Sequence, residues 1–187
     1  MNKSAISFHM LYMIPRLFFL IFVVLVIVFM LNGFRDVGYQ EAIYAEQQMF
    51  SEWIIYSTNG VSYFDPNLNT VLPGIINVED CISGLTEYRL NHSMSYGDKN
   101  KHISARITIL DRNKNDVIGR SIYYNEGKGK SYGFTFWEPL SQMRGEGASS
   151  YFIRTLPCLL ITPQTPPNQY ERGNIIIEIV IPNYENV

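Results

Sequence analysis

The chain has 187 residues, of which 47% are hydrophobic, 14% aromatic and 17% charged, and its formal net charge is −2. A chain with this much apolar and aromatic content can bury a core, so it is not intrinsically disordered. The small negative charge argues against a protein that binds nucleic acid through a basic surface. Two cysteines allow at most one internal disulfide, which excludes a disulfide-rich scaffold.

An uncharged apolar run near the N-terminus covers residues 17–31 and reads LFFLIFVVLVIVFML. Extended to residue 34 as a helix, the run is about 27 Å long, and the hydrocarbon core of a bilayer is about 30 Å thick. We therefore expect residues 1–34 to comprise a cytoplasmic tip and a retained transmembrane anchor, with Pro15 in the first turn of the spanning helix. One side of this helix carries a packing stripe at spacings of four, three and four residues: Leu20, Val24, Ile27 and Leu31.

Three other interpretations of the N-terminal segment are open. A cleaved secretory signal would need two small residues after the apolar run, and the sequence there is Leu31-Asn32-Gly33. A prepilin-type leader cut near residues 3–5 would have a glycine before the cut and a glutamate five residues after it, and neither is present. A buried core helix is disfavoured because the run is apolar on every side.

Basic residues on the two sides of the apolar run predict its orientation. Lys3 and Arg16 precede the run, whereas Arg35 follows it and the next basic residue is Arg89. The positive-inside rule then places the N-terminus in the cytoplasm and the C-terminal domain outside the cell membrane. All 17 acidic residues lie at Asp36 or beyond, so the exterior part is acidic, with a net charge of about −5.

Residues 35–58 are predicted to form an amphipathic stalk helix. Its apolar face consists of Tyr39, Ile43, Phe50 and Ile54, and glutamates lie on the other side. This face either packs on the domain of the same chain or forms an assembly surface between copies. Asn59-Gly60 is predicted to end the helix, because glycine often adopts the left-handed conformation after a helix.

After residue 59 the apolar pattern changes to the alternation typical of strands, so residues 59–187 are predicted to form a β-rich extracytoplasmic domain. In residues 103–110 the alternate isoleucines and Ala105 share one face, and in residues 174–181 Glu178 indicates the wetter face. Two hairpins are expected, one through the polar loop 111–116 and one through a proline-rich loop that begins near Pro163. The candidate strands are 61–65, 75–78, 85–90, 103–110, 117–124, 132–137, 151–161 and 174–181.

The predicted fold class is α+β. A long N-terminal transmembrane and stalk helix precedes an antiparallel β-sheet or a small β-sandwich.

Few residues in the domain carry the patterns of a chemical site. Cys81 and Cys158 either form one disulfide or remain two buried thiols. Asn91-His92-Ser93 is a formal glycosylation sequon. Residues 111–116 resemble the first half of a calcium loop, but a polar hairpin turn explains them better, and residues 126–130 are best explained as a flexible loop. The sequence therefore predicts no catalytic, cofactor-binding or metal-binding residues.

Two resemblances add to this interpretation. A hydrophobic N-terminal helix that leads into an amphipathic helix and a β domain is similar in layout to type IV pilins and archaeal pilin-like filament subunits. Residues 54–77, 105–115, 121–127 and 175–183 resemble uncharacterised single-pass surface proteins of small-genome archaea. The second resemblance implies an archaeal cell-surface setting and carries no functional residues over to this chain.

We therefore expect a membrane-anchored, non-enzymatic cell-surface structural protein, either a pilin-like or an envelope-assembly subunit. The alternative is a single-pass accessory subunit of a larger membrane complex. The expected partners are the lipid bilayer and, through the N-terminal helix, other copies or other membrane subunits; no nucleic acid and no cofactor are expected. An anchored hydrolase or ligand-binding module has no sequence signature, and would need a pocket with converging polar groups.

Overall fold

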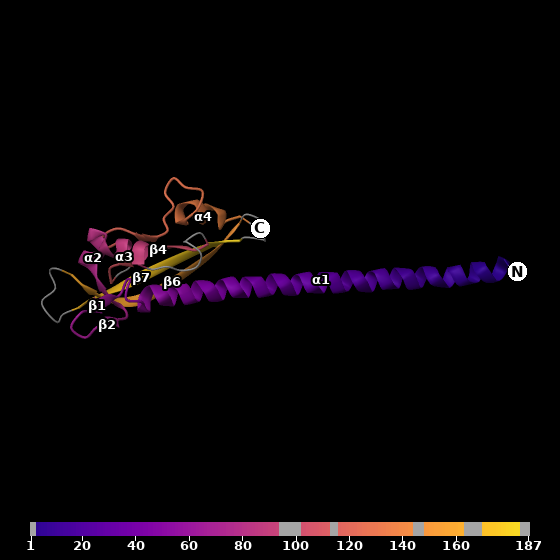
Figure 1. The fold of residues 1–187 in the computed structure, drawn as a ribbon, viewed down its shortest axis with the longest axis horizontal. Coiled ribbons are helices and arrows are strands. Elements are labelled where there is room, and N and C mark those ends of the chain that lie inside the picture. The colour runs from indigo at the N-terminus through magenta and orange to yellow at the C-terminus, as the bar shows by residue number, and fades with distance from the viewer. Residues whose placement is uncertain (1–2, 94–101, 113–115, 144–147, 163–169, 184–187) are drawn as a thin grey trace. The chain divides into compact units, whose positions relative to one another are not determined.

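The computed structural model describes residues 3–93, 102–112, 116–143, 148–162 and 170–183. The fold is α+β, with one long N-terminal helix followed by a curled, mixed β-sheet domain (Figure 1). The chain divides into two compact units, Met1–Ala42 and Ile43–Val187. The second unit contains the last turns of the long helix together with the sheet.

The described helices and strands follow one another along the chain without an internal repeat. They are α1 (Lys3–Tyr56), β1 (Tyr63–Asp65), β2 (Thr70–Leu72), β3 (Ile75–Asn77), α2 (Val78–Ser83), α3 (Leu85–Ser93), β4 (Ser104–Leu110), β5 (Ile122–Tyr124), α4 (Phe134–Leu140), β6 (Ser149–Ile161) and β7 (Glu171–Pro182).

The main sheet has five strands in the order β3-β6-β7-β4-β5. Both predicted hairpins are confirmed, because β4 pairs antiparallel with β5 and β6 pairs antiparallel with β7. β3 pairs parallel with the end of β6, so the sheet is mixed rather than wholly antiparallel. The last strand in the sequence, β7, is the central strand, and it lies between β6 and β4.

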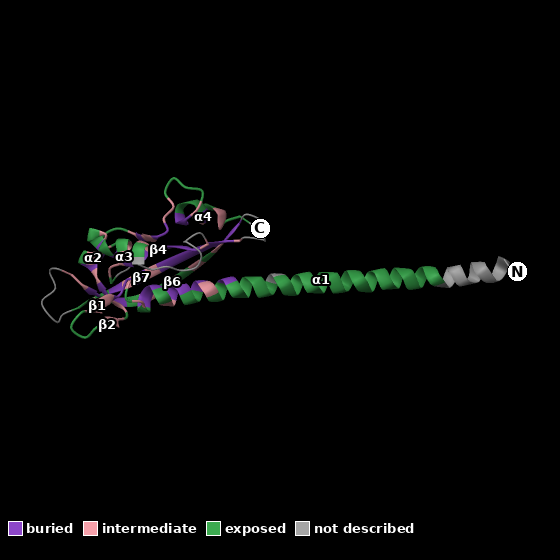
Figure 2. Ribbon diagram, viewed as in Figure 1, coloured by how far each residue is buried: buried purple, intermediate pink, exposed green. Residues whose placement is uncertain are grey.

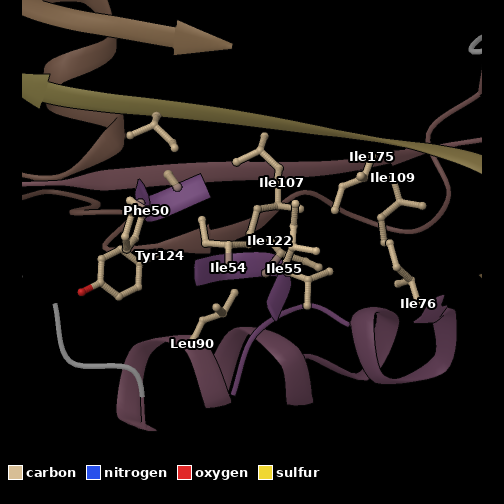
Figure 3. Close-up of a cluster of buried hydrophobic side chains, with 14 of the residues drawn as sticks. Phe50, Ile54, Ile55, Ile76, Leu90, Ile107, Ile109, Ile122, Tyr124 and Ile175 are labelled. Atoms are coloured by element: carbon tan, nitrogen blue, oxygen red, sulfur yellow. The ribbon is translucent and has the colours of Figure 1, made fainter. Parts of the chain in front are cut away.

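One face of the sheet carries the main core of the domain (Figure 3). The residues predicted to share a face in β4 and just before it, Ile103, Ala105, Ile107 and Ile109, are all fully buried there. Phe50 and Ile54 of α1 pack on this face together with Leu90 of α3. Strand alternation places every second side chain on the core side, which explains why the pattern predicted β4 correctly.

The opposite face of the sheet is covered at one end by α4. Phe134 and Trp137 of this helix are buried against Val180 of β7. Helices therefore lie on both faces of one sheet, and the described part of the domain is not a sandwich of two sheets. Ile176, Glu178 and Val180 were predicted to share the wetter face of β7. Ile176 is half-buried, but Glu178 and Val180 are buried, so the prediction is wrong about solvent at these two positions.

Two predicted strands are helices in the structure. Residues 85–90 belong to α3, where Thr86 and Leu90 are fully buried at a spacing of four, and residues 134–137 of the predicted strand 132–137 belong to α4. The aromatic and apolar residues of both segments favour a strand locally. The burial of residues three or four positions apart, Phe134 with Trp137 and Thr86 with Leu90, overrides that preference. In the predicted strand 117–124 only Ile122–Tyr124 pairs as β5, and Val117 forms an isolated bridge to Leu110.

The ends of α1 differ in how well the sequence predicts them. Pro15 lies inside α1 rather than in its first turn, because the mostly apolar residues before it continue the helix and the proline removes only one backbone hydrogen bond. At the C-terminal end α1 stops at Tyr56, close to the predicted Asn59-Gly60 signal, but the predicted reason is wrong because Gly60 does not adopt the left-handed conformation. The Val61 amide donates to the Ile54 carbonyl at 2.9 Å, and a Cβ at Gly60 would collide with that carbonyl group.

Candidate functional site

The most unusual surface of the chain is the N-terminal part of α1, described within its own unit. Every residue from position 13 to position 35 is exposed (Figure 2). An 18-residue window of this helix has a mean hydropathy of 2.9, and by length and composition the helix can cross a membrane. The predicted packing stripe Leu20, Val24, Ile27 and Leu31 is exposed, as are the residues between its members, so the structure does not distinguish the stripe from its neighbours.

The predicted stalk face is divided between the two compact units. Ile43, Phe50 and Ile54 are buried in the domain, whereas Tyr39 lies in the first unit and is exposed. Gln47 is also buried on this face, and its side-chain amide donates to the Ser150 carbonyl at 3.1 Å. The sequence pattern missed Gln47 because a glutamine between glutamates resembles a solvated position.

A charged cluster lies on the α4 side of the sheet. Arg106 of β4 donates through Nε and Nη2 to the two carboxylate oxygens of Glu178 on β7, at 2.5 and 2.8 Å. The same guanidinium reaches both oxygens of Glu138 on α4, at 2.8 and 3.3 Å, and lies over the ring of Phe134. The hydroxyl of Tyr151 on β6 donates to Glu178. The cluster therefore ties three strands to the helix that covers them.

The electrostatics of this cluster favour its charged form. The hydrogen bonds from Arg106 and Tyr151 and the charge of Arg106 lower the pKa of Glu178 against the opposing effect of burial. Burial and the hydrogen bond to Glu178 raise the pKa of Tyr151, so its phenol stays protonated and remains a donor. Both oxygens of Glu178 and the polar groups of Arg106 are already engaged within the protein. This arrangement suits a structural link between β4, β7 and α4 better than binding of a substrate.

The two cysteines are free thiols in the structure and both are buried. They belong to one core cluster, in which α2 packs against β6. Burial raises the pKa of each thiol to about 11, and the neighbouring Cys81 adds to the effect on Cys158. The Cys81 sulfur also lies 3.7 Å from the hydroxyl oxygen of Thr86. At neutral pH both groups are protonated, small and apolar.

The side chain of the sequon residue Asn91 is used inside the domain. Its amide nitrogen lies 2.7 Å from the Tyr123 carbonyl oxygen and 2.9 Å from that of Glu87, and its amide oxygen accepts from the Asn125 amide at 2.9 Å. These bonds attach α3 to the outer edge of β5. Glycosylation of this nitrogen would replace one of its two hydrogens, so the folded protein would lose one of the two hydrogen bonds that the nitrogen donates.

No family model, curated protein or solved structure matches this chain.

Proposed function

We propose that the protein is a membrane-anchored, non-enzymatic cell-surface structural subunit of the pilin-like or envelope-assembly kind. Residues 17–34 of α1 cross the bilayer, the N-terminus is cytoplasmic, and the β-rich domain lies outside the membrane. The observation that carries this proposal is that every apolar residue from Leu17 to Leu31 is exposed. Leaving one large apolar side chain in water rather than burying it costs about 1.5–3 kcal/mol, so we expect this helix to be covered by lipid or by other apolar helices.

The continuity of α1 supports a structural role for the anchor. A single helix, Lys3–Tyr56, contains both the apolar segment and the residues that pack on the sheet. Phe50 and Ile54 fix its C-terminal end in the core of the domain. One helix therefore contributes residues both to the proposed anchor and to the core of the domain.

A membrane experiment tests the anchor and its orientation. We expect the native protein to remain in the membrane pellet after extraction at alkaline pH and to leave it in detergent. Added protease should remove a C-terminal tag from intact cells and spare an N-terminal tag. A native protein that is soluble without detergent would contradict the anchor, and the reverse protection pattern would contradict the orientation. N-terminal sequencing of the same material separates a retained anchor from a cleaved signal.

A second experiment separates self-assembly from the accessory-subunit alternative. The native protein is purified in mild detergent, cross-linked, and examined by negative-stain microscopy and mass spectrometry. Homo-oligomers or filaments support the proposed subunit, whereas a fixed set of unlike membrane partners favours the accessory role. Monodisperse single copies without partners would contradict both.

A further inference from the structure

An open cleft lies at the end of the main sheet where β4 ends and β7 begins. Its volume is about 620 Å³, within the roughly 300–1,000 Å³ of small-molecule sites. Pro73, Pro157 and Leu159 contribute apolar surface to the cleft, and Arg112 and Arg172 also line it. None of the described residues that line it is acidic. The cleft therefore combines an apolar wall with two positive charges.

The two arginines of the cleft differ from the other arginines of the domain that the structure describes. Arg89, Arg106, Arg120 and Arg154 each form an ion pair with a carboxylate. Arg112 and Arg172 have no such pair within the described residues. The adjoining chain segments 113–115 and 163–169 contain no Asp or Glu that would supply one.

Several other polar groups of the cleft are already engaged with the protein. The Gly74 amide donates to the Ser62 hydroxyl at 3.3 Å, and the Gly74 carbonyl accepts from the Leu159 amide at 2.8 Å. The side-chain amide nitrogen of Asn174 donates to the Asp111 carbonyl at 3.3 Å. The two prolines have no amide hydrogen to offer. The guanidinium N–H groups of the two arginines, which only donate, are the charged hydrogen-bonding groups of the cleft.

A neighbouring hollow shares Arg112 and Arg172 and is also lined by Asp111 and Glu171. The Asp111 carboxylate accepts from the Asp116 amide at 3.4 Å. The acidic side chains thus line the neighbouring hollow and not the cleft beside Pro73 and Pro157, whereas the two arginines line both.

We propose that this cleft binds a small amphipathic anion, that is, a carboxylate or phosphate group attached to an apolar body. Guanidinium groups bind the oxygens of such anions through paired, charge-assisted hydrogen bonds. The surfaces of Pro73, Pro157 and Leu159 take the apolar body. This site does not depend on the membrane anchor, because all of its residues belong to the domain unit.

Equilibrium dialysis of the full chain in a non-ionic detergent tests the site, with detergent alone as the blank. The probes are hexyl phosphate and hexanoate, with inorganic phosphate and 1-hexanol as partial ligands. We expect saturable binding of at least one of the two amphipathic anions, weaker binding of phosphate and none of hexanol. The double variant Arg112→Gln/Arg172→Gln should weaken binding about tenfold or more, because it removes both charged donors of the cleft.

The matched control is Lys128→Gln/Lys130→Gln, which removes the same charge from a loop outside the cleft. It should bind the probe as the parent protein does, and both double variants should keep the parent's thermal midpoint. Equal binding by hexanol, equal losses in the two double variants, or no saturable binding of either amphipathic anion would overturn the proposal.

Discussion

Arg106 and Glu178 lie directly opposite each other on β4 and β7, and both carboxylate oxygens of Glu178 accept from the Arg106 guanidinium. The pair is shielded by α4 on one side and joined by the Tyr151 hydroxyl from β6. A charged pair on the sheet face that α4 covers holds the helix to the strands. It also explains why a glutamate can be buried in an otherwise isoleucine-rich strand.

Replacing Glu178 with Gln should lower the free energy of unfolding by about 1–3 kcal/mol at pH 7, because a charge-assisted bond is lost beside a partly buried guanidinium. Urea unfolding of the full chain in detergent measures the change. The matched control is Glu138→Gln, which changes the other carboxylate that binds the Arg106 guanidinium. Glu138 is the more exposed of the two carboxylates, so its loss should cost less. Equal costs for the two substitutions would contradict the central position of Glu178.

The same pair makes stability depend on pH. The folded protein lowers the pKa of Glu178, so its contribution is fully present above the unfolded value of about 4.3 and is lost as pH falls through the folded value. The difference in unfolding free energy between the parent and Glu178→Gln should therefore stay constant from neutral pH to about pH 5 and shrink below pH 4. A difference that grows in acid would have the wrong sign.

Replacing Phe50 with Ala should destabilise the domain by about 3–5 kcal/mol, the usual cost of deleting a buried aromatic side chain. Phe50 is fully buried, and its ring lies 5.1 Å from that of Tyr124. Met49→Ala is the control on the same turn of α1, since Met49 is 63% exposed. Its cost should stay within about 0.5 kcal/mol. Similar costs at both positions would mean that this part of α1 does not pack on the sheet.

Thiol reactivity distinguishes the two interpretations of the cysteines. With pKa values of about 11 and buried sulfurs, the native thiols should react with maleimide far more slowly at pH 7 than those of the unfolded protein, because the thiolate is the reactive form. The rate should rise about tenfold per pH unit below that pKa. Two thiols should titrate after unfolding without reductant. If none appears, Cys81 and Cys158 form the disulfide that the sequence permits.

A charge in the middle of the apolar segment tests the anchor directly. Val24→Lys should raise the apparent free energy of membrane insertion by about 2.5–3.5 kcal/mol, the cost of lysine at the centre of a spanning helix. Val37→Lys is the matched control, because Val37 lies beyond the apolar run and its lysine can reach the headgroups. An insertion reporter that responds equally to both substitutions would contradict the predicted span.

The sequence best predicted the strands in which apolar and polar residues alternate because one side of the strand faces the core. Strand β4 follows from alternation, and the two hairpins follow from the polar loop 111–116 and the proline-rich loop near Pro163 between apolar runs. The apolar stripe of α1 likewise predicted that Ile43, Phe50 and Ile54 share a surface. The structure identifies that surface as the core of the domain, a result that the spacing left open.

The sequence pattern failed where local preference and tertiary packing disagree. The residues of α4 are aromatic and favour a strand, but Gly133 precedes them with φ near 98° and the pair Phe134 and Trp137 is buried at helical spacing. The sequence also missed the partners of Arg106, since two carboxylates 32 and 72 residues away carry no local signal. The cleft at Arg112 and Arg172 was missed for the same reason.

The position of β7 at the centre of the sheet also determines when the domain can fold during synthesis. Phe50 and Ile54 are synthesised as part of α1. The central strand of the sheet on which they pack, β7, is synthesised about 120 residues later. At about 5–20 residues per second the wait is roughly 6–24 s. Throughout that interval the buried face of α1 has no finished surface to pack against. We expect nascent chains that stall before residue 171 to expose this face and to be favoured substrates for chaperones.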